Sequence, residues 1–244
     1  MQILDTTLRE GEQTRGVSFT FEQKKQIVET LDSFGVDIIE LGHPVVSPNI
    51  KKAVKNLAKL KLHAETMAHA RANLKDIDEA VDCGVDWVGI FISTSNIGIK
   101  TKYNYSKEQI LEKITESVEY AKSRGLKVRY TPEDGTRTER DYLLQAIHAG
   151  KKADRISIVD TVGTMTPSKF HELVKFVIKK SGKDLNVHCH NDFGLATANS
   201  LAAFEAGAKL SDVTINGLGE RVGITPLSEL TMALSQLHGV KKDW

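Results

Sequence analysis

The sequence contains little cysteine: only Cys83 and Cys189 occur among its 244 residues. The two lie in different segments, so they form neither the dense pattern of a disulfide framework nor the close spacing of a zinc finger. We predict that both are buried, reduced thiols that pack like small apolar side chains.

The chain also lacks the segments that direct a protein to a membrane. No apolar run approaches the roughly 18 residues of a membrane-spanning helix, and the N-terminal MQILDTTLRE lacks the basic and apolar regions of a signal peptide. The formal net charge is +1, which gives no electrostatic reason to expect a nucleic acid. These absences predict a cytoplasmic protein that binds neither nucleic acid nor membrane.

Low-complexity stretches, blocks of like charge and proline-rich linkers are absent too, so the composition marks no second domain. What the sequence does contain is an alternation of short apolar runs with helical patterns. The eight runs are QILDTTL, DIIELG, LHAETMA, WVGIFIST, KVRYTP, RISIVDT, NVHCHN and DVTING. This number of units favours a closed (β/α)8 TIM barrel over an open doubly wound sheet, and it predicts a single domain over residues 1–244.

The segment after the first run shows how clearly the helices are marked. Thr20 and Gln23 have the spacing of a capping box, and Gly35 follows as a stop signal. The same signals recur over residues 106–125. We predict an amphipathic helix in each place.

The seventh run, NVHCHN, carries the first sign of a functional site. Alternate side chains on a strand point to the same side, so Asn186, His188, His190 and Asp192 share one face while Cys189 points to the other. In a barrel the polar face lines the interior, and the C-terminal strand ends reach the mouth where such barrels place their chemistry. The two histidines could chelate a metal ion, or they could be satisfied by hydrogen bonds in a core.

The first run supplies a third candidate ligand. In DTTLREGEQ, strand alternation predicts Asp5, Thr7 and Arg9 on one side, with Glu10 where the strand gives way to a loop. Strands 1 and 7 both flank strand 8 in a closed barrel, so we expect Glu10 near the two histidines. Two imidazoles and one carboxylate with open coordination positions are typical of a divalent metal site, for Zn, Mn, Co or Mg.

Other strand ends offer further polar side chains. In VRYTPED, Arg129, Thr131 and Glu133 alternate onto one face, either as a binding surface or as an internal salt bridge between Arg129 and Glu133. Thr161 ends the sixth run and His69 follows the third. Each of these two has an ordinary hydrogen-bonding or packing alternative.

The stretch after the eighth run, NGLGERVGITP, is rich in glycine, which permits a backbone path close to a ligand. In many barrels the loops after strands 7 and 8 bind phosphate. Alternatively, Glu220 and Arg221 form an ion pair that only fixes the loop. The sequence leaves both interpretations open.

Three motifs together give the chain a resemblance that covers its whole length. DTTLREGEQ, HCHNDFGLATANSLAAFEAGA and GLGERVGITPL stand in this order. They resemble the signatures of the homocitrate synthase and isopropylmalate synthase family, metal-dependent acyltransferases related to 3-hydroxy-3-methylglutaryl-CoA lyase. The last motif looks most like the homocitrate synthase form. The resemblance implies condensation of acetyl-CoA with a 2-oxo acid, in an enzyme of amino-acid biosynthesis that is commonly a homodimer.

The resemblance also implies roles for individual residues. Glu10, His188 and His190 would hold the divalent metal. Arg9 would stabilise the developing alkoxide, and Glu133 would act as an acid or base. The residues that the resemblance places around the 2-oxo acid are Arg9, Gln13, His69, Arg129, Thr131 and Thr161.

The sequence also departs from that family. A C-terminal helical region that supplies a catalytic histidine to the neighbouring subunit, and an effector-binding domain, have no counterpart before Trp244. A barrel that binds metal and 2-oxo acid without turnover is therefore an alternative. Gly89 stands where homocitrate synthases carry an acidic residue, which predicts a changed wall at the distal end of the substrate and keeps 2-oxoisovalerate and pyruvate open as acceptors.

The glycine-rich loop bears on the remaining alternatives. Ile224 and Thr225 stand where isopropylmalate and citramalate synthases read Gly-Asn, which favours 2-oxoglutarate and the homocitrate type. The loop also lacks the cysteine that the lyases carry there, which argues against cleavage of a 3-hydroxy-3-methylglutaryl-CoA-like substrate.

Overall fold

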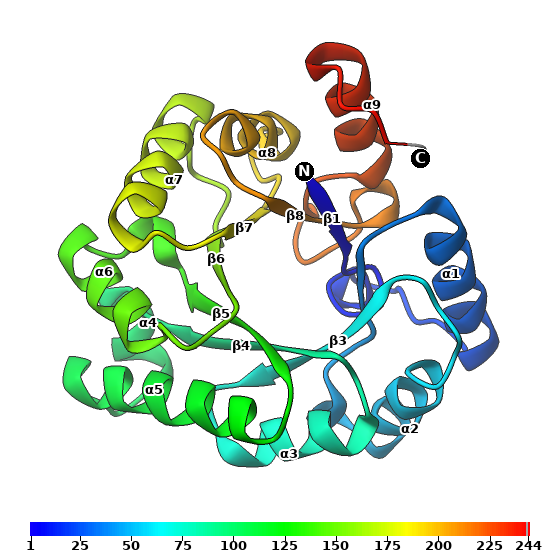
Figure 1. Cartoon of the computed structure of the whole chain (residues 1–244), viewed down its shortest axis with the longest axis horizontal. Helices are drawn as coiled ribbons and strands as arrows, with labels where there is room; N and C mark the ends of the chain where they lie inside the picture. The colour runs from blue at the N-terminus through cyan, green and yellow to red at the C-terminus, as the bar shows by residue number, and fades with distance from the viewer. Residues whose placement is uncertain (243) are drawn as a thin grey trace.

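The computed structural model describes residues 1–242 and 244 and forms a closed barrel inside a ring of helices (Figure 1). The strands follow one another round the barrel in sequence order, and the last strand pairs in parallel with the first. This arrangement confirms the (β/α)8 TIM barrel that the alternation predicted.

The elements are short and regularly spaced. The strands are β1 (Gln2–Asp5), β2 (Ile38–Glu40), β3 (Glu65–Arg71), β4 (Trp87–Ser93), β5 (Lys127–Glu133), β6 (Arg155–Asp160), β7 (Leu185–Cys189) and β8 (Leu210–Val213). The helices in the described part of the chain are α1 (Phe21–Phe34), α2 (Pro48–Leu57), α3 (Leu74–Cys83), α4 (Asn96–Lys102), α5 (Lys107–Ser123), α6 (Arg140–Ala149), α7 (Pro167–Ser181), α8 (Ala196–Glu205) and α9 (Leu227–His238). Short 3-10 turns are η1 (Gly11–Gln13), η2 (Pro44–Val46), η3 (Gly135–Arg137) and η4 (Ile215–Gly217).

The helix signals in the sequence are confirmed. Thr20 and Gln23 make both hydrogen bonds of a capping box at the start of α1, and Gly35 ends that helix with a φ of 91°. Ser106 and Gln109 form the same box at the start of α5. A capping box satisfies two backbone N–H groups that would otherwise lack partners, which fixes where each helix begins.

β1 ends sooner than alternation predicted, and this changes how the N-terminal motif is presented. The backbone N–H groups of Arg9 and Glu10 donate to the carbonyl of Thr6 at 3.0 and 2.8 Å, so the chain turns directly after Asp5. The expected alternation of Asp5, Thr7 and Arg9 along one strand is therefore wrong. This turn, and not the strand pleat, brings Arg9 and Glu10 to the barrel mouth.

Two other strands are displaced from their predicted positions. β3 extends to Arg71 because its pairing with β4 continues as far as Phe91, so His69 lies within this strand and not after it. β8 ends at Val213, and the chain then forms the turn η4, so most of the predicted run DVTING is not strand.

The barrel interior changes from apolar to charged along the strands. At one end, five buried side chains form a small apolar cluster of their own: Leu4, Ile38, Met67, Trp87 and Leu210. Two residues further along β2, β3 and β8, the interior side chains are Glu40, His69 and Asp212. The charged groups at the C-terminal strand ends therefore lie above an apolar floor.

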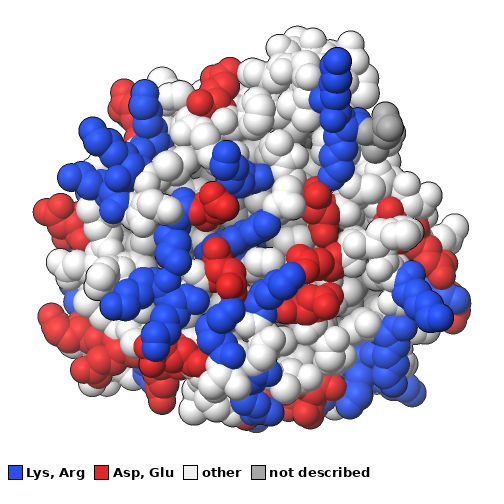
Figure 2. Space-filling model, viewed as in Figure 1, with Lys and Arg blue, Asp and Glu red and all other residues white. Residues whose placement is uncertain are grey.

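The general expectations about the chain agree with the structure where it tests them. Cys83 and Cys189 are free and buried, as predicted. No helix among the described residues has the length and apolarity needed to cross a bilayer. On the face seen in Figure 2, basic and acidic side chains are interspersed and neither sign forms a continuous patch, in keeping with the small net charge.

Candidate active site

A cavity of about 380 Å³ lies among the C-terminal ends of the strands. The residues that the sequence analysis gave a catalytic, substrate-binding or metal-binding role all line it: Arg9, Glu10, Gln13, His69, Arg129, Thr131, Glu133, Thr161, His188 and His190. A cavity of this size suits a small metabolite.

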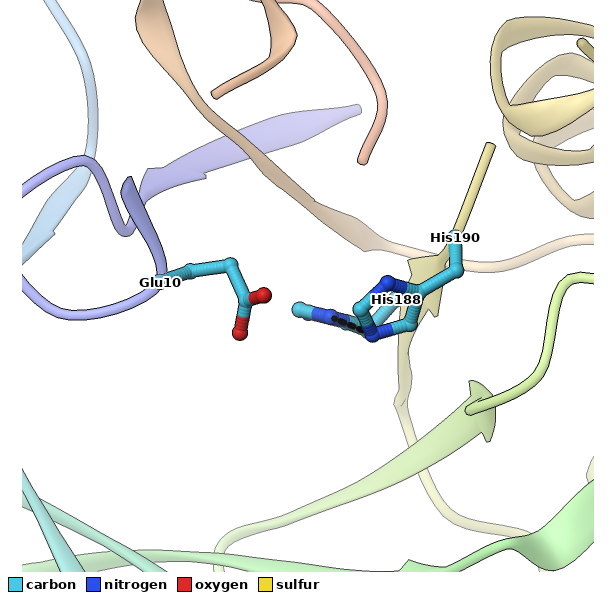
Figure 3. Close-up of side chains that lie close together, drawn as sticks. All are labelled: Glu10, His188 and His190. Carbon is cyan, nitrogen blue, oxygen red and sulfur yellow. Dashed lines mark hydrogen bonds between the residues drawn. The ribbon is translucent and has the colours of Figure 1, made fainter. Parts of the chain in front are cut away.

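The centre of the cavity holds the predicted trio of metal ligands. Glu10 comes from the turn after β1, and its carboxylate points toward the rings of His188 and His190 at the end of β7 (Figure 3). One ligand atom from each residue lies within 4.8 Å of the others, and all three residues are buried. Strand order brings them together, because β8 is the common neighbour of β1 and β7.

The two histidine rings approach each other through the same atom, Nε2. The Nε2 atoms of His188 and His190 are 3.3 Å apart. Nδ1 of His188 lies 2.9 Å from a carboxylate oxygen of Asp212. Burial opposes ionisation of Asp212, but Arg129 and His188 outweigh it and hold the pKa of this carboxyl below its ordinary value. An ionised carboxylate only accepts, so Nδ1 of His188 carries a proton, and in the neutral ring Nε2 then presents a lone pair.

His190 completes the case for a cation at this point. Burial and the neighbouring His188 lower the pKa of His190 to about 3, so its ring is neutral at physiological pH. Within the described chain its Nδ1 is buried without a hydrogen-bond partner. Nδ1 of His190 lacks a partner in either tautomer, and with the proton on Nδ1 the Nε2 lone pairs of His188 and His190 face each other. A divalent cation binds two such lone pairs, so the residues fit the predicted metal.

Glu10 is held in place from two sides. One carboxylate oxygen accepts the backbone N–H of Glu220 at 2.9 Å, and the other pairs with the guanidinium of Arg9. Burial alone would raise its pKa, but the charge of Arg9, foremost, and the hydrogen bond from Glu220 help to lower it to about 2. The carboxylate is therefore ionised and oriented before any ligand arrives.

A chain of ion pairs runs from this trio through the barrel interior. Arg9 donates from Nε to Glu40 at 2.8 Å, and Nη2 of Arg129 lies 3.4 Å from the same carboxylate. Nη1 of Arg129 donates to both oxygens of Asp212 at 3.0 Å. Asp212 in turn contacts His188, so the series of contacts begins at one predicted metal ligand, Glu10, and ends at another, His188. Both guanidinium groups are thus already neutralised by buried carboxylates.

The wall opposite the histidines is aromatic. His69 stacks on Phe91 with ring centroids 4.5 Å apart, and His43 lies edge-on to His69 at 5.5 Å. Nδ1 of His69 lies 3.0 Å from Glu40. Burial and the charge of Arg9 lower the pKa of His69 to about 4, although Glu40 acts in the opposite direction. His69 therefore faces the cavity as a neutral ring.

Two side chains of β5 have unused polar atoms at the cavity. Oγ1 of Thr131 and Oε2 of Glu133 are buried without a partner among the described residues. The other oxygen of Glu133 accepts from Lys102 at 2.6 Å. The alternative that Glu133 pairs with Arg129 is therefore wrong. Unpaired buried oxygens are costly, which favours a substrate that engages them.

The loops after β6 and β8 are tied together at the cavity edge. Arg221 donates to both oxygens of Asp192 at 2.7 and 2.8 Å and to the carbonyl of Thr161 at 2.8 Å. Glu220 lies 3.8 Å from the same guanidinium. The ion pair that the sequence left open does form, but Asp192 is the closer partner. The hydroxyl of Thr161 accepts the backbone N–H of Asp134 at 3.0 Å.

Gly89 does not form the wall that the sequence predicted. It is not among the residues that line the cavity. A Cβ at this position would lie 3.1 Å from Nη2 of Arg129 and 3.3 Å from Sδ of Met67. A side chain here would therefore act on the Arg129 guanidinium first, and on a bound ligand only through it.

Sequence reasoning missed four contributors to the site. Glu40 and Asp212 were given no role, although each is a charged residue inside a strand-like run, which is itself a signal because an unpaired charge in a barrel interior is costly. His43 and Phe91 were missed because nothing in one sequence distinguishes them from packing residues.

The family model and the similar proteins agree on the family to which this chain is related. Residues 1–243 match the model of the HMGL-like family. The homocitrate synthase of Pyrococcus abyssi is 49% identical over 242 residues, which cover 98% of this chain and 67% of that protein. The 2-isopropylmalate synthase of Sulfurisphaera tokodaii is 49% identical over 243 residues, which cover 98% of this chain and 63% of that protein. The chain therefore spans about two thirds of the length of these relatives.

A solved structure with the same architecture is the HMG-CoA lyase of Bacillus subtilis. It superposes with a TM-score of 0.85 over 99% of this chain and 87% of that chain, at 20% sequence identity. At this identity the likeness extends to the fold alone.

Proposed function

This chain belongs to the HMGL-like family, and from that premise we propose that it joins the acetyl group of acetyl-CoA to the keto carbon of a 2-oxo acid. The family match confirms the resemblance that the motifs indicated. The observation that carries the proposal is the cluster of Glu10, His188 and His190 beside Arg9 in one cavity. These groups suit an acid that chelates a metal through a carboxylate oxygen and its keto oxygen.

The proposed cofactor is a divalent cation held by Glu10, His188 and His190, with Mg, Mn, Zn or Co as candidates. When bound, it supplies Lewis-acid polarisation of the keto group. Arg9 supports this chemistry from the side, because its guanidinium already contacts Glu10 and faces the cavity. A fixed positive charge at this point stabilises the alkoxide that develops on the keto oxygen.

We assign the proton transfer to Glu133. Its buried Oε2 has no partner in the described structure, while Lys102 holds the other oxygen. Oε2 removes a proton from the methyl group of acetyl-CoA, and the methyl carbon bonds to the keto carbon as the π bond of the keto group opens to an alkoxide. The alkoxide takes up a proton, and water hydrolyses the thioester to a carboxylic acid and free CoA. The neighbouring hydroxyl of Thr131 donates a hydrogen bond to a substrate oxygen, and Gln13 and Thr161 line the same space.

The first candidate for the acceptor is 2-oxoglutarate, which gives homocitrate. The glycine-rich loop supports it, because Ile224 and Thr225 match the homocitrate type. In this case the second carboxylate of the acceptor is placed near His69, Arg129 and Thr131.

A specific observation favours a second candidate, an acceptor with one carboxylate such as 2-oxoisovalerate or pyruvate. The charge of Arg129 is balanced by Asp212 and Glu40, and His69 is neutral. Neither residue offers an unpaired positive charge to a second carboxylate. The apolar side chains of Leu8, Val46, Ile50, Phe91 and Val159 also line the cavity.

The deciding experiment measures release of the CoA thiol from acetyl-CoA with 2-oxoglutarate, 2-oxoisovalerate, pyruvate and oxaloacetate. Each acceptor is tested with added manganese or magnesium and again with a chelator, and its binding is followed by calorimetry in parallel. Metal-dependent release with one acceptor supports the proposal and names the substrate. Metal-dependent binding without release supports a barrel that lacks turnover, whereas an absence of both contradicts the proposed function.

A further inference from the structure

The carboxylate of Asp212 takes part in four hydrogen bonds in the barrel interior. It lies on β8 with 1% of its surface exposed. One oxygen accepts from Nδ2 of Asn186 at 3.0 Å, the other contacts Nδ1 of His188 at 2.9 Å, and Arg129 donates to both. Neutralising the charge of Arg129 does not require a hydrogen bond to His188, so that contact points to a second role for this carboxylate.

We propose that Asp212 is a positioning residue for the metal site, which fixes the tautomer and ring orientation of His188 so that its Nε2 lone pair faces Glu10 and His190. The proposal rests on the metal-dependent function proposed above. Hydrogen bonds from the second nitrogen of a metal-binding histidine to a carboxylate commonly orient such rings and tune the bound metal. Through Arg129, the same carboxylate also connects this histidine to the side of the cavity that contains Arg9.

The geometry predicts what happens when the charge of Asp212 is removed without changing its shape. In Asp212→Asn, one oxygen becomes an NH2 group and has to face a neighbour that now donates. Arg129 presents donors that cannot change. Asn186 could accept only by turning over its amide, which would give up the hydrogen bond from its Nδ2 to the carbonyl of Val187 at 3.4 Å. His188 becomes an acceptor at lower cost, by moving its proton from Nδ1 to Nε2. The substitution is therefore expected to place a proton on the nitrogen that faces the metal position.

The test measures tautomer and metal affinity separately. In protein labelled with 15N-histidine, we expect wild-type His188 to be the Nδ1–H tautomer without metal, and Asp212→Asn to shift it to Nε2–H. Titration with Co²⁺, followed by calorimetry and by the visible absorption spectrum, is expected to show about 10- to 100-fold weaker binding in the variant.

The control is a carboxylate that is equally buried but contacts no histidine side chain. Asp160 is 0% exposed and accepts from the backbone N–H groups of Thr164 and Met165. Asp160→Asn is expected to lower the unfolding temperature while Co²⁺ affinity and spectrum stay at wild-type values. A purely structural role for Asp212 predicts that both variants behave in this way.

Three outcomes overturn the inference. Wild-type Co²⁺ affinity and spectrum in Asp212→Asn would do so directly. If that variant does not fold, the tautomer of the wild-type protein still decides, because an Nε2–H form of His188 without metal contradicts the assignment. A wild-type protein that binds no Co²⁺ overturns the metal-dependent function as well, which separates the failure of the larger proposal from the failure of this one.

Discussion

A single methyl group added at Gly219 should weaken metal binding without replacing any metal ligand. A Cβ at this position would lie 3.1 Å from Oε1 and 3.2 Å from Cγ of Glu10, and 3.1 Å from Cα of Gly223. Those contacts are tighter than ordinary van der Waals packing. Glu10 cannot move aside freely, because the N–H of Glu220 and the guanidinium of Arg9 hold its two oxygens.

The magnitude follows from the cost of overpacking, which is about 1–3 kcal/mol for an added methyl group in a close-packed site. If the strain is relieved by displacing the Glu10 carboxylate, metal affinity in Gly219→Ala should fall by about 5- to 150-fold, at roughly 1.4 kcal/mol per tenfold change. Metal coordination tolerates errors of only about 0.2 Å in ligand distance, so a small displacement suffices.

The assay is calorimetric titration of Mn²⁺ or Co²⁺ into the wild type, Gly219→Ala and a control, with thermal unfolding of each to establish that it is folded. Gly11→Ala is the matched control, because Gly11 follows Glu10 in sequence but a Cβ there meets only ordinary contacts, the nearest at 3.4 Å. We expect near wild-type affinity in the control. Wild-type affinity in Gly219→Ala would refute the argument that Glu10 is a ligand held by packing.

Three further predictions concern the ligands, the pH response and the fold. Glu10→Ala and His188→Ala should each abolish metal-dependent binding of the 2-oxo acid in a folded protein, and unchanged metal affinity by calorimetry in both would contradict the ligand assignment. Burial lowers the pKa of His69 to about 4 and of His190 to about 3, so the unfolded chain binds more protons there below pH 6.5. Protonation of these two residues in the unfolded chain lowers the free energy of unfolding as pH falls, and Asp5, whose pKa burial raises to about 7, offsets part of the loss. Urea unfolding without metal should lose about 1.4 kcal/mol in total between pH 6.5 and 5, and a flat profile would count against it. Gly150→Ala places a methyl group against the buried ring of Tyr130. It should lower the free energy of unfolding by about 1–3 kcal/mol and leave metal affinity unchanged.

The barrel and the metal trio were predictable because each rests on a local rule. Helix caps such as Thr20 with Gln23 determine where the helices begin. Alternation along β7 places His188 and His190 on one face. Barrel closure then predicts that Glu10 lies nearby. The mistake at β1 arose because the residues after Asp5 have strand-like character up to Gly11, and the turn that forms there depends on backbone hydrogen bonds to Thr6.

Which charged side chains form ion pairs inside the barrel was not predictable from their spacing along the chain. Arg129 and Glu133 stand on the same face of β5, but residues four apart on a strand are separated by roughly 13 Å. The guanidinium reaches instead across the interior to Asp212, 83 residues away in sequence, and to Glu40. Which strands face each other at a given height depends on the stagger of the whole barrel, and one sequence without relatives does not reveal it.

The origin of the metal ligands at opposite ends of the sequence has a consequence for folding. Glu10 follows the first strand and His188 belongs to the seventh, so the site exists only after β8 has paired with β1 and closed the ring. An ion that binds there favours the closed chain over every partly assembled form, by about 2.7 kcal/mol at a free concentration one hundred times its dissociation constant. Contacts between chain ends form slowly because they are distant in sequence. A cation at this site would therefore stabilise the least local pairing of the barrel, and its removal would raise the fraction of molecules in which the first and last strands are unpaired.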